Sequence, residues 1–184
     1  MTIVESIRAE FLRYKALAES AIAQLDDAQL SVDGEGGGNS IAVICWHISG
    51  NLKSRFTDFL TSDGEKPWRQ RDEEFQARRV TRAELLEKWE SGWAPLLGTL
   101  AALTDEQLQG TVTIRRQPLV VHEALHRSLG HTAYHVGQIV YQAKSLRAGA
   151  WTCLSIPPRG SDAYNRDPTN EHAAGHTATL MDRR

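Results

Sequence analysis

The feature that most constrains this chain is a set of apolar residues spaced three or four positions apart in four separate segments. That spacing gathers apolar side chains on one face of an α-helix, and such a face has to be buried against another element. The segments cover residues 3–25, 41–62, 82–100 and 118–149. We therefore predict an all-α fold, an antiparallel four-helix bundle whose domain spans residues 1–150.

Capping and breaking residues indicate where the predicted helices begin and end. Ser40 is a suitable N-cap for the second helix, and Thr81 opens a capping box for the third. Pro118 fits the first turn of the fourth helix, which Gly149 is expected to stop. A glycine-rich stretch over residues 33–39 separates the first two helices, because so many glycines do not sustain helical structure.

The segments between and after these helices lack clear apolar periodicity. Residues 63–80 are polar and charged, and we predict a long crossover loop there; such a length is uncommon in a loop without a function. Residues 104–107 are predicted to form one helical turn, and residues 111–114 a strand fragment with no obvious partner. Residues 151–184 contain three prolines, and we predict a C-terminal tail that packs on the bundle or extends from it.

Charge and composition argue against several classes of protein. The 21 basic and 23 acidic residues leave a net charge of −2 with neutral histidines, which is not the basic footprint of a nucleic-acid-binding protein. No apolar run approaches the ~20 residues of a membrane span, and the N-terminus has no basic leader segment. Cys45 and Cys153 form no CxxC pair and suggest reduced thiols. We therefore expect a cytoplasmic protein with neither a nucleic acid nor a membrane as partner.

Histidine is the unusual component, because six of the seven histidines form three pairs spaced four residues apart. His131 and His135 share one face of the predicted fourth helix, so their imidazoles can close on one metal ion. A helical wheel places this pair at the margin of its apolar stripe, and it places His47 at the margin of the second helix's stripe. If the two margins meet, three imidazoles surround one point and leave a coordination position open, as catalytic metal sites do. Taken alone, His47 is better explained as a boundary histidine bonded to a neighbour.

The other two histidine pairs do not join this group. His122 and His126 lie on the opposite side of the predicted fourth helix, and we interpret them as a surface or interface pair. His172 and His176 fall in the predicted tail, where Gly175 disfavours a helix, and we interpret them as incidental.

The crossover segment combines aromatic residues with charges of both signs. Arg69 and Arg71 can each hold a carboxylate with two hydrogen bonds, and Trp68 can supply a flat wall, so the loop is suited to an anionic ligand. The competing interpretation is a solvated loop with local ion pairs, each of which contributes little stability. Cys45 lies within the apolar stripe of the second helix and is predicted to be a core thiol rather than a nucleophile.

Several longer motifs run through the chain: NSIA at 39–42, HISGNL at 47–52, FLTSDGEKPWR at 59–69, HTAYHVGQI at 131–139, and SIP at 155–157 with YN at 164–165. In these motifs the chain resembles the DinB/YfiT-like superfamily, and more closely one branch of it known chiefly as a domain of unknown function. The likeness covers nearly the whole chain up to residue 165. The glycine run at 34–38 and the residues after 165 have no match in the family pattern.

The resemblance implies an antiparallel four-helix bundle with one divalent metal held by His47, His131 and His135. Imidazole ligands suit zinc, nickel, copper and iron alike, and of these we expect zinc or nickel. Relatives in the superfamily include transferases that attach a low-molecular-weight thiol to an electrophile, and a thiol-dependent isomerase. For this branch the resemblance implies no particular reaction. The general acid or base and the catalytic residues are not identified by the sequence.

Three hypotheses about function stay open at this point. The first is a metal-dependent enzyme, a thiol S-transferase or a related metalloenzyme, in which the metal activates a small thiol or water. The second is a non-catalytic metal-binding or stress-response protein, and the third is a plain helical bundle whose histidines only fill a cleft. For the first we expect a small-molecule substrate, and the sequence does not decide between a monomer and a homodimer. The predicted substrate-binding residues are Asn51, Arg55, Arg69, Arg71 and Trp151.

Overall fold

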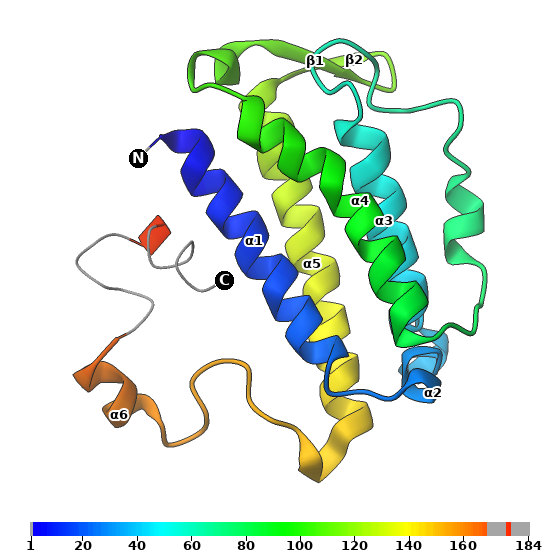
Figure 1. The fold of residues 1–184 in the computed structure, drawn as a ribbon, viewed down its shortest axis with the longest axis vertical. Helices are drawn as coiled ribbons and strands as arrows, with labels where there is room; N and C mark the ends of the chain where they lie inside the picture. Colours follow the sequence, from blue (N-terminus) through cyan, green and yellow to red (C-terminus); the bar gives the residue numbers. More distant parts are fainter. Residues whose placement is uncertain (1, 169–175, 178–184) are drawn as a thin grey trace.

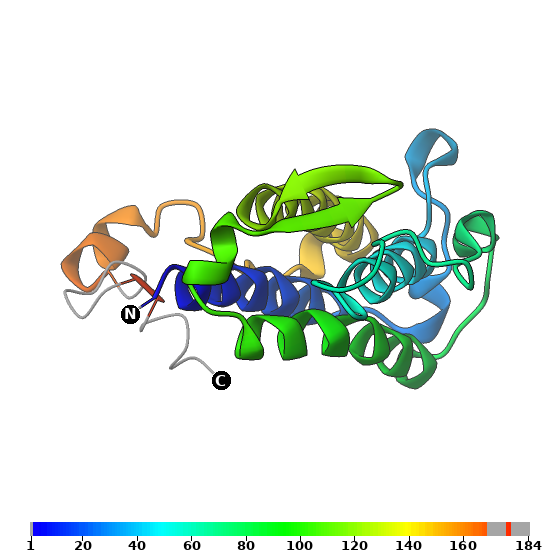
Figure 2. The ribbon, with the colours of Figure 1, turned by 90° about the horizontal axis from the view of Figure 1, so that it is seen from above.

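The computed structural model describes residues 2–168 and 176–177, and this part of the chain is largely helical (Figure 1). Its four longest helices lie side by side: α1 (Ile3–Ile22), α3 (Ile41–Phe56), α4 (Arg82–Ala102) and α5 (Val121–Arg147). Helix α1 packs against α4 and α5, and α3 packs against the same two helices (Figure 2). The prediction of a mainly helical fold is confirmed.

Side-chain hydrogen bonds set the starts of two of these helices, as the sequence predicted. The hydroxyl of Ser40 accepts a hydrogen bond from the backbone N–H of Val43 at 3.2 Å, at the start of α3. At the start of α4, the hydroxyl of Thr81 accepts from the N–H of Glu84, whose carboxylate accepts from the N–H of Thr81 in return. Each such cap satisfies backbone donors that the first helical turn leaves unpaired.

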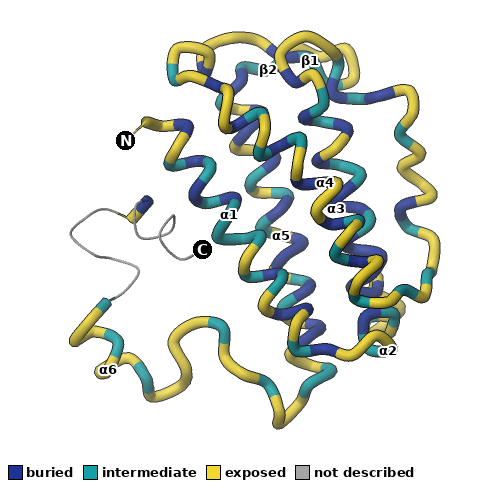
Figure 3. Tube along the Cα trace, viewed as in Figure 1, coloured by how far each residue is buried: buried dark blue, intermediate teal, exposed yellow. Residues whose placement is uncertain are grey.

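Each of the four long helices carries buried residues, drawn in dark blue in Figure 3. Most of them are apolar, and their side chains form the core. Trp89 and Trp93 of α4 are fully buried with ring centroids 5.3 Å apart, and Phe11 of α1 meets Trp93 edge to face at 6.3 Å. Gly92 allows α4 to approach α3 closely, since a Cβ atom at this position would lie 2.3 Å from the Cα of Ser49. The helices therefore bury a large apolar core that does not depend on a bound ion.

A small two-stranded sheet corrects two of the sequence predictions. Strand β1 (Thr111–Ile114) does have a partner, because it pairs antiparallel with β2 (Gln117–Val120). Pro118 lies in β2 opposite Thr113, so the prediction that this proline opens the fourth helix was wrong. Helix α5 begins three residues later, at Val121. A four-residue strand is too short to show periodicity, which is why the sequence did not indicate β2.

The turn of this hairpin is held by the crossover segment. Arg115 and Arg116 both have positive φ angles, 54° and 62°, as a two-residue hairpin turn requires. The carboxylate of Asp63 accepts hydrogen bonds from the backbone N–H groups of both arginines, at 2.9 and 2.7 Å. Two residues other than glycine or asparagine can therefore occupy this turn because a carboxylate from elsewhere in the chain satisfies their donors.

Two predicted helix ends also differ from the structure. Helix α3 stops at Phe56 rather than near residue 62, since Thr57 is extended and Asp58 takes a positive φ of 49°. Phe59 is nevertheless buried, so the apolar spacing continues past the end of the helix. Helix α5 ends at Arg147, and Ala148 takes a positive φ of 43° at the position next to the predicted stop.

Several short elements connect or follow the long helices. None of the helices in the described residues has the length and apolar content needed to cross a membrane. Gln24 and Thr152 exchange hydrogen bonds of 3.0 and 2.8 Å, which attach the start of the predicted tail to the end of α1. The sequence did not predict α2 or α6, because one or two helical turns carry too few residues to show a period. The short elements are α2 (Asp27–Leu30), η1 (Glu35–Gly37), η2 (Arg71–Phe75), η3 (Glu106–Gln109), η4 (Ala148–Ala150) and α6 (Ser161–Arg166).

Candidate metal centre

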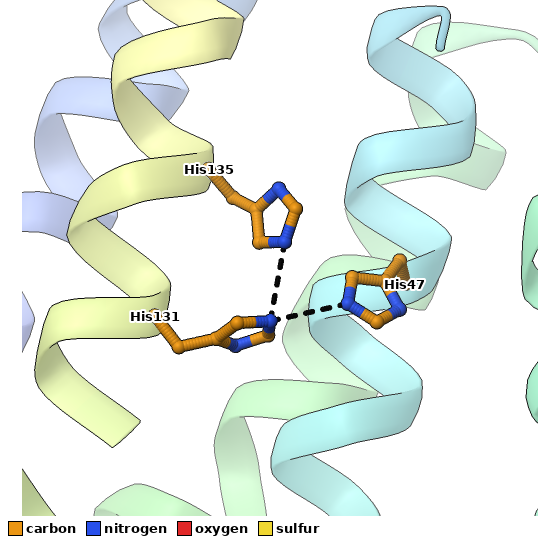
Figure 4. A group of neighbouring side chains, drawn as sticks. All are labelled: His47, His131 and His135. Atoms are coloured by element: carbon orange, nitrogen blue, oxygen red, sulfur yellow. Dashed lines mark hydrogen bonds between the residues drawn. The ribbon is translucent and has the colours of Figure 1, made fainter. Parts of the chain in front are cut away.

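Three histidines from two helices point toward one another (Figure 4). His47 projects from α3, and His131 and His135 project from α5. The Nε2 atom of His131 lies 3.2 Å from Nε2 of His47 and 3.1 Å from Nε2 of His135. The three ring nitrogens that could bind a metal, one from each histidine, all lie within 4.8 Å of one another. The structure thus brings together the three histidines that the helical wheels and the resemblance named.

Core packing fixes the direction in which these side chains point. Ile48 follows His47 directly, Val136 follows His135, and both apolar side chains are buried between the helices. Because neighbouring residues in a helix are turned by about 100°, the histidines stand at the edge of the core. His47 is 5% exposed and His135 is 9% exposed, so both rings are largely removed from water.

A carboxylate from the crossover loop orients His47. Nδ1 of His47 lies 3.0 Å from Oε2 of Glu74, the buried acid in η2. Arg69 in turn donates two hydrogen bonds to the same carboxylate, both at 2.8 Å. Metal-binding histidines commonly donate their second N–H to a carboxylate in this way, which fixes the ring and its tautomer.

The sequence did not identify Glu74, although one signal for it exists. Gly50 follows His47 by three residues on α3, and a Cβ atom there would lie 2.1 Å from Oε1 of Glu74. The glycine therefore leaves the space that the carboxylate occupies. A glycine within a helix, one turn from a candidate ligand, indicates close approach by another group but does not say which group.

Gln138 plays the corresponding part for His135. Its Oε1 atom lies 2.8 Å from Nδ1 of His135, three residues earlier on the same helix. This partner could have been found from sequence, because residues three apart on a helix are neighbours.

Counting donors and acceptors shows that the three histidines fit a cation. The acceptors Glu74 and Gln138 require both His47 and His135 to carry their proton on Nδ1, so their Nε2 atoms present lone pairs. Both lone pairs face Nε2 of His131, which in a neutral ring carries one proton at most. At most one of the two short contacts is then a hydrogen bond, and the other brings two nitrogens together with no proton between them unless a cation lies among them.

The charge state of the group is set by its surroundings. Burial lowers the pKa of His131 to about 4, and the nearby His135, His47 and Arg69 contribute in the same direction. Burial also lowers the pKa of His135, against the hydrogen bond to Gln138, which raises it. A neutral imidazole is the form that binds a metal ion, so this environment keeps His131 and His135 available near neutral pH.

Glu74 is ionised in the same setting. Burial by itself would raise the pKa of Glu74, but the hydrogen bonds from Arg69 and His47 outweigh it and hold the pKa below its usual value. A negative charge is thus held next to the ring of His47, where it favours binding of a cation at the opposite nitrogen.

Phe75 covers the ring of His47, and a pocket lies beside Gln138, the partner of His135. The ring of Phe75 lies 4.6 Å from that of His47, and the guanidinium of Arg71 lies 4.9 Å from the centroid of Phe75. A pocket of about 270 Å³ begins at Gln138 and is lined by the glycine-rich loop and the next turns of α5. The sequence assigned no role to the glycine run, which here forms a pocket wall.

The predicted substrate-binding residues occupy different places, and their role stays a prediction. Asn51 follows His47 by one turn of α3 and is partly buried. Arg55 donates hydrogen bonds to the carbonyl of Gly64 and to Glu65, so it ties the crossover loop to α3. Arg69 holds Glu74, as described above, and the side chain of Arg71 is half exposed at 3.7 Å from Asp72. Trp151 follows the end of α5, and from His135 to that end the helix rises about 18 Å.

The other histidines are engaged elsewhere. Nδ1 of His122 lies 3.1 Å from the carbonyl oxygen of Leu108, and the rings of His122 and His126 are 6.0 Å apart. In the tail, Nε2 of His176 lies 2.7 Å from a carboxylate oxygen of Glu10 on α1. His172 lies outside the residues that the structure describes.

Fold and site together define a largely helical protein with a three-histidine group able to hold a metal ion. Residues 1–160 match the family described as "Protein of unknown function (DUF1572)", and the chain belongs to this family. No curated protein matches the chain significantly.

Proposed function

We propose that this protein is a divalent-metal-dependent enzyme whose metal, zinc or nickel, is held by His47, His131 and His135. The observation that supports it best is the short distance of 3.2 and 3.1 Å from Nε2 of His131 to Nε2 of His47 and of His135, with at most one proton available for these two contacts. Imidazole nitrogens suit both ions, and three protein ligands leave a position for a further ligand. When bound, such an ion lowers the pKa of a thiol or water and supplies a nucleophile at neutral pH.

We further propose that the reaction is the transfer of a low-molecular-weight thiol to an electrophile. The resemblance to the DinB/YfiT-like superfamily supports this class of reaction, as does the arrangement of four long helices, which we assign to the antiparallel bundle of that superfamily. A homodimer and a cytoplasmic location stay predictions from the sequence.

Within this proposal, the chain's own residues hold the ligands and receive the substrate. Glu74 and Gln138 keep His47 and His135 in the tautomer that presents Nε2, and Arg69 holds Glu74 in place. The pocket that is lined by Gln138, the hydrogen-bond partner of His135, offers about 270 Å³ for a small molecule. Asn51 and Arg71 remain the candidates for contact with the thiol.

One experiment tests the metal and the reaction separately. Protein purified without a metal-affinity column is analysed for bound metal, and then assayed for conjugation of several bacterial thiols to a model electrophile, with and without added zinc or nickel. We expect one divalent ion per chain and metal-dependent conjugation, and we expect His135→Ala to lose both while remaining helical.

The outcomes distinguish the proposal from its alternatives. Metal bound without any turnover would favour a non-catalytic metal-binding or stress-response protein. Absence of metal, with the same background rate in His135→Ala, would show that the histidines only fill the space between α3 and α5.

A further inference from the structure

A second pocket, of about 550 Å³, lies on the outer side of α3 and α4. Its lining includes Trp46 and Lys53 of α3, Lys88 of α4, and Trp68 and Arg78 of the crossover segment, which passes beside these helices (Figure 1). The pocket also borders Arg69 and Glu74, which are already paired with each other. The sequence connects Trp68 and Arg69 with an anionic ligand, but it assigns no role to Lys53, Arg78 or Lys88.

The cations of this pocket are arranged around two tryptophans. The guanidinium of Arg78 lies 4.7 Å from the ring centroid of Trp46, and the ammonium of Lys88 lies 5.9 Å from the same centroid. The ammonium of Lys53 lies 6.0 Å from the ring of Trp68, which is 50% exposed. The pocket thus offers positive charge and a flat apolar wall side by side.

These cations lack carboxylate partners among the residues that the structure describes. Arg78 donates to the backbone carbonyls of Glu73, Glu74 and Gln76 rather than to an acid. No ion pair within 4.0 Å joins Lys53 or Lys88 to an acid in the described chain. With four cationic and two acidic residues in the lining, the formal charge of the pocket is +4 − 2 = +2.

The ammonium group of Lys88 lies in an environment with more positive than negative charge. Burial lowers the pKa of Lys88, Lys53 and Arg78 lower it further, and Glu74 opposes them. A bound anion would offset this repulsion. A dianion matches the excess charge of the pocket better than a single carboxylate does.

We propose that this pocket binds a small phosphate monoester that carries a flat ring. Lys53, Arg78 and Lys88 would hold the phosphate, as cations do in phosphate sites, and the exposed face of Trp68 would stack on the ring. None of the three histidines lines this pocket, which shares Gly50 and the Arg69–Glu74 pair with the surroundings of the histidine centre.

The test uses phenyl phosphate as the probe, with tryptophan fluorescence and calorimetry in a phosphate-free buffer of low ionic strength. We expect saturable binding of one molecule per chain. Lys88→Met should weaken it by roughly tenfold or more, the loss typical of a hydrogen bond between charged groups. Lys144→Met removes an exposed lysine on α5 away from the pocket, and it should leave the affinity unchanged. Lys53→Met serves as a second test should Lys88→Met fail to fold.

Further probes and one further variant show whether the ligand class and the location are right. Phenol and inorganic phosphate should each bind more weakly than phenyl phosphate, because each lacks one half of the proposed ligand. His135→Ala should bind phenyl phosphate as the unaltered protein does. No saturable binding, equal losses in Lys88→Met and Lys144→Met, or loss of binding in His135→Ala would each overturn the proposal, and so would equal binding of either half-ligand.

Discussion

At the scale of single residues, the hydrogen bond at Nδ1 of His47 and of His135 fixes the tautomer of each ring and so leaves Nε2 without a proton. Glu74 and Gln138 accept from Nδ1 of His47 and His135, and this leaves both Nε2 lone pairs facing His131. Arg69 extends this chain of contacts because it forms an ion pair with Glu74. The side chain of Arg69 is only 2% exposed, so Glu74 neutralises a buried charge. The site is therefore organised by residues that do not belong to the group of three histidines.

Replacing the acid that orients His47 tests this arrangement. We expect Glu74→Gln to weaken metal binding by about 10- to 100-fold, because it removes the charge behind His47 and leaves Arg69 buried without its partner. Competition with a coloured chelator measures the affinity. Glu73→Gln is the matched control, since Glu73 is the exposed neighbour of Glu74 in η2. Equal affinity in the two variants would contradict the orienting role of Glu74.

The lowered pKa of His131 predicts how the stability of metal-free protein depends on pH. In the unfolded chain this histidine takes up a proton near pH 6.5, whereas in the folded chain it does so only near pH 4. The unfolded state therefore binds more protons between these values, and the free energy of unfolding should fall as the pH drops from about 6.5 to about 4.

Urea unfolding of chelator-treated protein at several pH values checks this expectation. His131→Gln should make the pH dependence between pH 6.5 and 4 less steep, since a glutamine does not titrate, and the lowered pKa of His135 should account for part of what remains. An unchanged slope in that variant would mean that other groups cause the loss of stability.

At the scale of elements, the crossover loop connects α3 and α4, which pack closely against each other. Both helices border the crossover, and η2 packs against α3 to deliver Glu74 and Phe75 to His47. At its other end the crossover holds the hairpin turn through Asp63. The loop between α3 and α4 is therefore a structural part of the site.

Two glycines of α4 allow the helix contact to be tested. A Cβ atom at Gly92 would lie 2.3 Å from the Cα and 2.8 Å from the carbonyl oxygen of Ser49, whereas one at Gly98 would meet nothing within 4 Å. We expect Gly92→Ala to lower the free energy of unfolding by about 1–3 kcal/mol through overpacking. Gly98→Ala should raise it by about 0.5–1 kcal/mol, since alanine is the better helix former. Urea unfolding distinguishes the two, and a stabilising Gly92→Ala would contradict the close packing.

At the scale of the whole molecule, the core and the histidine centre contribute separately to stability. The tryptophans of α4 and the apolar faces of the other long helices are buried whether or not an ion is bound. The chain should therefore fold without metal and gain stability when metal binds, by an amount that rises with the logarithm of the ratio of metal concentration to dissociation constant.

Thermal unfolding measures this gain. At a metal concentration of about 100 times the dissociation constant, linkage predicts about 2.7 kcal/mol. For a chain of this size that corresponds to a rise in Tm of roughly 5–10 °C. Chelator should remove the rise and leave the helical circular dichroism intact, and His135→Ala should show no rise. Loss of helical signal on chelation would mean that the fold itself requires the metal.

The sequence by itself determined what depends on local spacing. Helical periodicity located the four long helices, and side-chain caps located the starts of α3 and α4 at Ser40 and Thr81. The same periodicity placed His47, His131 and His135 at the margins of the apolar stripes, because a helix converts residue number into direction. Burial of those stripes then leaves little freedom for where the histidines point.

The tertiary structure decided what depends on contacts between distant segments. Glu74 reaches His47 from a loop without periodicity, and Asp63 stabilises a hairpin turn more than 50 residues away. The cationic pocket likewise combines residues of α3, α4 and the crossover. Such contacts follow from how helices pack and where loops cross, and residue spacing within one segment carries no record of them.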